Sequence, residues 1–454
     1  MGIRGSRMVA PFLLAFSALA VHLLPFLLYG VQPLGYDTGF YRRYLIQPFV
    51  SIPNPVVPGL GADALLPRLV LDTLRILNLS PEVALYGSYI LFFSLLPVLL
   101  YHWLKPHHGA HAALIAGLLL ALSPVGYTAF WYMLYKNAFA LCFIFLAFIA
   151  YERRLLWPLL ALDVAIALSH KTSAIIYLAT LCVLVLVDRT RWKEVALHVG
   201  IVALLVLLLA SGGGSISPQT LGTSAVAVFL EWHEHIVLSA ALIIAAAYAA
   251  AHWRTIPVPK TLLAFALASF AFPIFHLPFY QRIFVFTDIA LIAFAAYGIN
   301  LIVSKIGFDD ETSYAPYGYF VLLCVIGGLH LGNLQSQVVQ LQPLQSSERL
   351  AQIAAIGSLV PPEALLLTTN AEAPWYEGWT LSHIAAPGML RDTHNFDTWV
   401  KFWESTSTPE QIAFLNTFPK PLYVSTLGDF TELVSGPPPC LTKVSPNLLR
   451  NDCR

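Results

Sequence analysis

Long apolar stretches separated by short polar connectors run through the first three quarters of the chain. Crossing the hydrocarbon core of a bilayer takes ~20 apolar residues in a helix. The pattern predicts eleven membrane spans, at 9–29, 83–104, 110–123, 129–151, 155–170, 172–188, 195–211, 236–252, 260–277, 283–303 and 315–333. Composition agrees with this pattern, because mean hydropathy is +0.70 and only 11% of the residues are charged, well below the usual share in a soluble domain.

Basic residues fall mainly into every second connector. With the amino terminus placed in the cytoplasm, the inner connectors hold eleven lysines and arginines and the outer connectors seven, four of them in one long loop. The positive-inside rule therefore predicts a cytoplasmic amino terminus in a multi-pass protein of the cell membrane. The first span lacks a small-residue cleavage site after its apolar core, so we expect a retained anchor. An odd number of spans places the residues that follow the last one outside.

The connector at 30–82 is much longer than a turn requires, and we predict that it is a structured outer loop. Within it, 65–77 has Arg68, Asp72 and Arg75 on one helical face and leucines on the other. Such a segment is typical of a helix that lies in the membrane interface. Long loops with their own structure are usually functional.

Residues 335–454 have a different pattern and are predicted to form a separate domain outside the membrane, after a transmembrane domain at 1–334. A helical pattern covers 348–359, buried strands are predicted at 364–369 and 422–425, and further helices near 396–405 and 408–416. Strands alternating with helices indicate a small α/β domain. Cys440 and Cys453 both lie in this part, where an oxidising compartment would allow a disulfide between them. The predicted fold class is an all-α polytopic membrane protein with a small C-terminal α/β extracytoplasmic domain.

Ionisable residues near the outer ends of the spans are the candidates for chemistry, since such groups are costly at membrane depth. They are one carboxylate and four basic side chains: Asp37, Lys136, His170, Lys171 and Arg282. A carboxylate can take the proton of an attacking hydroxyl, and cations can hold a departing phosphate. The set therefore favours group transfer from a phosphate leaving group.

Each of these residues also has a simpler interpretation. Asp37 lies among ordinary turn residues, and Lys136 and Arg282 could extend toward lipid headgroups. Arg42 and Arg43 are alternates for binding the phosphate, although they could equally bind anionic lipid. Asp63, in a glycine-rich turn, is the backup carboxylate.

Neither composition nor spacing indicates a particular cofactor. Glu231, His233, Glu234 and His235 form the densest group of metal-type side chains, but histidines two residues apart do not share a helical face. No metal site is therefore assigned, and dependence on a divalent metal stays open. The net charge of zero gives no indication of nucleic acid, which is not expected as a partner.

The first-loop stretch 35–41 (Gly-Tyr-Asp-Thr-Gly-Phe-Tyr) resembles the first-loop motif of the GT-C superfamily of membrane glycosyltransferases. The aromatic stretch 370–379 is similar to segments in the outer domains of prokaryotic members, and the overall layout matches. The resemblance implies a polyprenyl-phosphate-linked sugar as donor, an acceptor that is protein, lipid or glycan, inverting transfer, and Asp37 as the catalytic carboxylate. The chain lacks an adjacent acidic pair at Asp37 and the tryptophan-tryptophan-aspartate signature of oligosaccharyltransferases, which weighs against transfer to asparagine.

Two other functional classes remain as alternatives. A secondary transporter would usually show internal repeats and broken helices near mid-membrane, and no similarity between halves is evident. A polymerase or ligase of lipid-linked polysaccharide would also need outer arginines and a long outer loop, but there the loop usually comes late in the chain. The position of the loop after the first span favours the glycosyltransferase.

Overall fold

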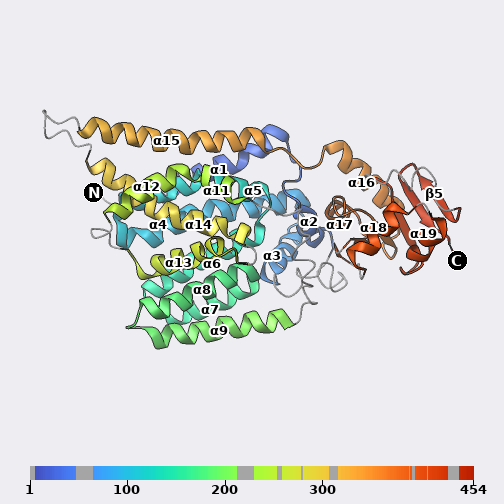
Figure 1. Cartoon of the computed structure of the whole chain (residues 1–454), viewed down its shortest axis with the longest axis horizontal. Coiled ribbons are helices and arrows are strands. Elements are labelled where there is room, and N and C mark those ends of the chain that lie inside the picture. The colour runs from blue at the N-terminus through green and yellow to red at the C-terminus, as the bar shows by residue number, and fades with distance from the viewer. Residues whose placement is uncertain are drawn as a thin grey trace. The chain divides into compact units, whose positions relative to one another are not determined.

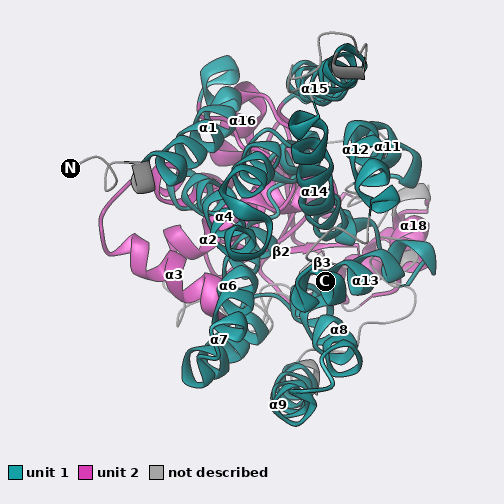
Figure 2. Cartoon of the chain, turned by 90° about the vertical axis from the view of Figure 1, so that its left-hand side faces the viewer, with its two compact units in different colours: residues 1–30, 86–212, 228–342 teal, residues 31–85, 213–227, 343–454 magenta. Residues whose placement is uncertain are grey.

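The computed structural model describes residues 6–47, 65–211, 230–252, 258–277, 280–305, 315–387, 389–390, 394–405, 407–427 and 439–453. The chain divides into two compact units (Figure 2). The first contains Met1–Gly30, Tyr86–Gly212 and Val228–Gln342, and the second contains Val31–Leu85, Gly213–Ala227 and Pro343–Arg454.

The first unit is a bundle of apolar helices whose long members run side by side (Figure 1). In chain order they are α1 (Ser6–Tyr29), α4 (Pro81–Ala121), α5 (Pro124–Trp131), α6 (Tyr135–Glu152), α7 (Leu156–Ser169), α8 (Lys171–Val187), α9 (Trp192–Ser211), α11 (Trp232–Leu238), α12 (Ala240–Ala251), α13 (Lys260–Ile274), α14 (Tyr280–Ser304) and α15 (Ala315–Gln340). Large apolar side chains such as Phe12, Leu27 and Leu207 are exposed on this unit, as a surface facing lipid requires.

All eleven predicted spans coincide with apolar helices, and four of them differ in form. The spans at 83–104 and 110–123 are the two halves of α4, which bends at Gly109, where φ is 81°. The span predicted at 129–151 begins only at Tyr135, because Ser123 caps a separate short helix, α5, by accepting a hydrogen bond from the amide of Gly126. The span at 236–252 consists of α11 and α12, bent by 72° at Ser239.

Helix length alone supports fewer complete crossings than eleven. Among the described residues, six helices are long and apolar enough to span a membrane, or seven when α11 and α12 count as one. The helices α7, α8 and α13 are apolar but shorter. The prediction of a mostly helical, multi-pass membrane protein is confirmed.

The second unit joins two helices of the first loop, α2 (Thr38–Ile46) and α3 (Leu65–Arg75), to an α/β domain. That domain contains α16 (Ser347–Leu359), β1 (Leu365–Leu367), α17 (Ala373–Trp379), β2 (His383–Ala386), β3 (Met389–Leu390), α18 (Phe396–Glu404), α19 (Thr408–Leu415), β4 (Leu422–Ser425), β5 (Leu441–Ser445) and β6 (Leu448–Asn451). Six elements of this unit match predicted segments to within one residue at the start: β1, β4, α3, α16, α18 and α19.

The six-stranded sheet has the order β3-β2-β1-β4-β6-β5. Its centre is parallel, with Leu366 of β1 opposite Ile384 of β2 and Tyr423 of β4, and its edges are antiparallel. One face of the sheet packs on residues of α16 and α17 together with Phe40 of α2. The other face packs on α18 and α19. The helix that carries Phe40 therefore belongs to the core of the C-terminal domain.

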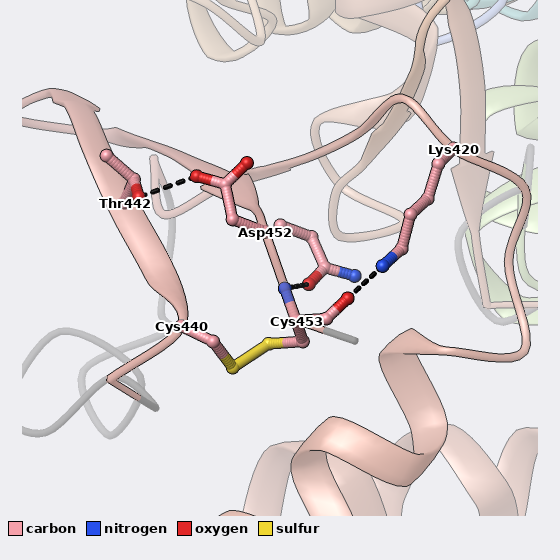
Figure 3. The surroundings of a disulfide bond; sticks show 6 residues. Lys420, Cys440, Thr442, Asp452 and Cys453 are labelled. Carbon is pink, nitrogen blue, oxygen red and sulfur yellow. Dashed lines mark hydrogen bonds between the residues drawn. A yellow bond between two sulfur atoms is a disulfide. The ribbon is translucent and has the colours of Figure 1, made fainter.

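A disulfide joins Cys440, just before β5, to Cys453, just after β6 (Figure 3). It closes the last hairpin of the chain. The hydroxyl of Thr442 donates to Asp452, and Lys420 donates to the carbonyl of Cys453 (Figure 3). This end of the domain is therefore fixed by covalent and polar contacts as well as by its apolar core.

Candidate functional site

Asp37 lies at the first turn of α2, in a segment whose backbone is fixed on both sides. The amide of Thr38 donates to the carbonyl of Gly35, and the hydroxyl of Thr38 donates to the carbonyl of Leu34 at 2.8 Å. Asp37 occupies the N-cap position, yet its carboxylate makes no capping hydrogen bond to the helix. The residue is half-buried. An aspartate at a helix start usually accepts from the first amides, and Asp37 does not use its carboxylate in this way.

Tyr36 connects the same turn to the C-terminal domain. Its hydroxyl donates to the carbonyl of Asn370, and its ring packs edge-on against Trp375. Burial, followed by the charges of Asp37 and Glu372, raises the pKa of the Tyr36 phenol. Tyr36 therefore stays a hydrogen-bond donor at neutral pH. Glu372 is held at one oxygen by Arg349, at 2.7 Å.

Arg42 and Arg43, the predicted alternates for binding phosphate, are both engaged with α17. Arg42 donates to Glu82 at 2.8 Å and to the carbonyl of Gly378. Arg43 is 2% exposed and donates to backbone carbonyls at the end of the helix. These contacts fix the two arginines within the second unit, so a phosphate would have to compete with existing partners.

Two of the predicted basic residues, Lys136 and Arg282, lie near a third, His170. Lys136 is in the first turn of α6, His170 forms the extended turn between α7 and α8, and Arg282 is in the first turn of α14. Burial and the positive charges of Lys136 and Arg282 lower the pKa of His170 well below its usual range. Its Nδ1 is 2.8 Å from the hydroxyl of Ser173. Lys171 follows directly as the first residue of α8.

Glu231 lies close to this basic group, and nothing in the sequence indicated that proximity. The side-chain amide of Gln281, next to Arg282, donates to the carboxylate of Glu231 at 3.2 Å. Glu234 accepts from the backbone amide of Glu231 and so caps α11. His235 is buried and stacks on Phe284 at a centroid distance of 4.4 Å. The glutamates and histidine of this segment therefore stabilise the start of α11.

Among the described residues, no group of three or more His, Cys, Asp or Glu side chains is arranged to hold a metal ion. The segment 231–235 does not form such a group, because His235 is turned into the core. The backup carboxylate Asp63 lies outside the described residues.

Two acidic residues inside the apolar helices also escaped the sequence analysis. Asp163 of α7 accepts from the hydroxyl of Tyr177 on α8 and pairs with His198 of α9, and all three side chains are buried. Asp288 of α14 accepts from Ser123 at 2.7 Å and from Ser239 at 3.1 Å. An acidic residue within an apolar helix is the signal that could have identified both. Each joins three segments of the bundle.

Comparison with known proteins gives matches only at the level of structure. No protein-family model and no curated protein sequence matches the chain. Among solved structures, the Archaeoglobus fulgidus oligosaccharyltransferase in complex with Zn and sulfate aligns with a TM-score of 0.66 and 11% identity, covering 92% of this chain and 68% of that one. The same enzyme tethered to an acceptor peptide aligns over 93% and 69%, with a TM-score of 0.66 and 11% identity.

A second similar structure matches over nearly the full length of both chains. ArnT from Cupriavidus metallidurans bound to undecaprenyl phosphate aligns with a TM-score of 0.59 and 13% identity, covering 99% of this chain and 98% of that one. Identity this low establishes the fold and no more. The resemblance predicted from the first loop and the layout is thus confirmed at that level: the chain has the fold of the GT-C membrane glycosyltransferases.

Proposed function

We propose that this protein transfers a sugar from a polyprenyl-phosphate donor to an acceptor hydroxyl outside the membrane. The observation that carries the proposal is the end-to-end fold match to ArnT, whose structure contains undecaprenyl phosphate. The acceptor peptide on the oligosaccharyltransferase supports an acceptor site in the same fold. The sugar and the chemical class of the acceptor are left to experiment.

In the proposed reaction Asp37 is the general base. The acceptor oxygen attacks the anomeric carbon of the sugar while the Asp37 carboxylate takes the hydroxyl proton. The bond between the anomeric carbon and the phosphate oxygen breaks, and polyprenyl phosphate leaves with the bonding electrons. Attack opposite the leaving group inverts the anomeric configuration. The uncapped carboxylate at the start of α2 supports this role.

The donor phosphate is proposed to bind Lys136, His170, Lys171 and Arg282. The His170 imidazole can donate or accept a hydrogen bond, while the cations neutralise the charge that develops on the leaving phosphate. Because Arg42 and Arg43 already bind α17, we assign them no direct contact with the donor.

The test separates donor binding from turnover. Purified wild-type protein, Asp37→Asn and Arg282→Gln are measured for equilibrium binding of a panel of polyprenyl-phosphate sugars and for sugar transfer. Asp37→Asn keeps the size of the side chain but cannot take a proton, so it should bind donor normally and lose roughly 100- to 10,000-fold in rate. Arg282→Gln should weaken donor binding by ~1.5–3 kcal/mol, since the phosphate loses a charged hydrogen-bond partner.

Lys305→Gln is the matched control. Lys305 is an exposed lysine that directly follows α14, and Arg282 lies in the first turn of that helix. Its donor binding and rate should equal those of the wild type. Wild-type turnover in Asp37→Asn would exclude Asp37 as the base. Undiminished donor binding in Arg282→Gln would exclude the proposed phosphate site.

A further inference from the structure

We propose that Arg43 is a positioning residue that fixes Asp37 by anchoring α2 to the C-terminal domain. The proposal rests on the proposed function of Asp37 as the base. Arg43 lies six residues after Asp37 on the same short helix, and its side chain is almost fully buried. The proposal gives Arg43 a role other than contact with lipid or phosphate.

The first observation is the way the Arg43 guanidinium closes the end of α17. It donates to the carbonyls of Glu377 at 3.4 Å, Thr380, and Leu381 at 3.0 Å, and its Nε lies 3.7 Å from the Glu377 carboxylate. The last carbonyls of a helix lack partners within the helix, and a cation there is favourable. One side chain of α2 thus contacts the last turn of α17 and the two residues that follow it.

The second observation is direct contact between the two helix backbones. A Cβ added at Gly39 would lie 1.6 Å from the carbonyl oxygen of Pro374, and one added at Gly378 would lie 2.5 Å from the Cα of Gly39. Neither position has room for a side chain. Helix α2 therefore touches α17 only two residues after Asp37.

The third observation is that further contacts hold α2 and the turn before it on the same domain. Tyr36 donates to Asn370. Arg42 binds the carbonyl of Gly378 and places its guanidinium carbon 4.6 Å from the centre of the Trp379 ring. Residues 36, 39, 42 and 43 thus all contact 370–381.

These contacts make the C-terminal domain the support on which the Asp37 turn is built. Of the two arginines, Arg43 gives the clearer test. Among the described residues, the polar contacts of its guanidinium go to residues 377–381, whereas Arg42 divides its contacts between α17 and Glu82. A misplacement of ~1 Å can lower the rate of a catalysed step by ~100-fold. Loosening the Arg43 contacts should therefore reduce turnover without touching the residues proposed to bind the donor.

The experiment compares Arg43→Lys with Arg75→Lys. Lysine keeps the charge but cannot donate to three carbonyls in a fixed fork. We expect kcat, counted per donor-binding site from equilibrium binding, to fall roughly 10- to 100-fold in Arg43→Lys with the donor KM unchanged. Amide hydrogen exchange within 38–46 should become faster. Arg75, in a partly exposed pair with Asp72 on α3, should change neither quantity.

A second control removes the disulfide with Cys440→Ser and Cys453→Ser, which destabilises the C-terminal domain away from α17. A purely structural role for Arg43 predicts that this control and Arg43→Lys lose activity in proportion to their loss of stability. Positioning predicts that only Arg43→Lys loses kcat per donor site. Should Arg43→Lys fail to fold, Gly378→Ala, which pushes directly on Gly39, decides the same question.

The proposal is overturned if Arg43→Lys keeps the wild-type kcat and the wild-type rate of amide exchange in 38–46. The same result in Gly378→Ala overturns it if Arg43→Lys does not fold. Failure of the proposed function is distinguishable from this result. If Asp37→Asn keeps the wild-type rate, Asp37 is not the base, while the exchange measurement still shows whether Arg43 holds α2 on the domain.

Discussion

His170 shows how a single position combines burial with the field of its neighbours. The residue forms the turn between α7 and α8 and is 3% exposed. Burial is the larger cause of its lowered pKa, and the charges of Lys136 and Arg282 act in the same direction. A lowered pKa favours the neutral form of the imidazole. A protonated histidine here would add a third charge beside two half-buried cations.

The lowered pKa of His170 has a consequence for stability. In the unfolded chain a histidine titrates near pH 6.5, so below that pH the unfolded state binds a proton that the folded state does not. Stability is thus complete above about pH 6.5 and is lost as the pH falls. The loss should grow as the pH falls further below 6.5.

Thermal unfolding of wild type and His170→Gln between pH 7.5 and pH 5.5 measures this term. The wild type should lose more of its unfolding midpoint than the variant over this range. Titration of other groups affects both proteins equally and cancels in the difference. Parallel curves for the two proteins would show that His170 does not titrate in this way.

At the scale of single elements, the apolar stretches of the sequence located the long helices. Features that depend on only a few residues were missed. Each apolar stretch predicted a helix because burial in a bilayer requires continuous apolar length. The break between α11 and α12 has no such signal: Ser239 is an ordinary small polar residue whose role comes from Asp288 on another helix. Strands β2, β3, β5 and β6 are two to five residues long, too short for an alternating pattern to be distinctive.

Some residues of the candidate site could be named from the sequence, because they stand at the ends of apolar stretches, and others could not. Asp37, Lys136, His170, Lys171 and Arg282 could be named from their positions at the ends of apolar stretches. The anchoring of Arg42 and Arg43 to α17 could not, because the residues of α17 that they contact lie more than 330 residues away in the sequence. The aromatic stretch 370–379 was recognisable as unusual, but not as the helix that receives α2.

The packing of α12 on α14 depends on one glycine, and this makes a prediction at the element scale. Small residues let membrane helices approach closely. A Cβ added at Gly298 of α14 would lie 2.1 Å from the carbonyl oxygen of Ala245 on α12, so the helices leave no room for a side chain there. Gly298→Ala should cost ~1–3 kcal/mol through overpacking, seen as a lower unfolding midpoint.

Gly200→Ala is the control for that measurement. Gly200 lies within α9, and nothing is within 4 Å of a Cβ built there. Alanine favours a helix over glycine by ~1 kcal/mol, so this variant should be as stable as the wild type or more so. Equal midpoints for the two alanine variants would mean that close approach at Gly298 contributes nothing.

For the whole molecule, the compact units do not follow the order of the chain. The first loop, which the hydropathy pattern groups with the membrane spans, belongs to one unit with Pro343–Arg454 (Figure 2). Contacts such as Phe40 in the core of the α/β domain explain this grouping. The loop and the C-terminal domain must therefore lie on the same side of the membrane, a constraint that any topology has to satisfy.

The distribution of basic residues predicts which side that is. With more lysine and arginine in the inner connectors than in the outer ones, the positive-inside rule places the amino terminus in the cytoplasm and the second unit outside. Single cysteines at exposed positions test this: Arg153→Cys and Lys305→Cys should react with a membrane-impermeant maleimide only after the cells are opened. Lys401→Cys and Lys443→Cys, exposed on the C-terminal domain, should react in intact cells. Labelling of the first pair in intact cells, or protection of the second pair, would reverse the orientation and remove the outer face from the proposed reaction.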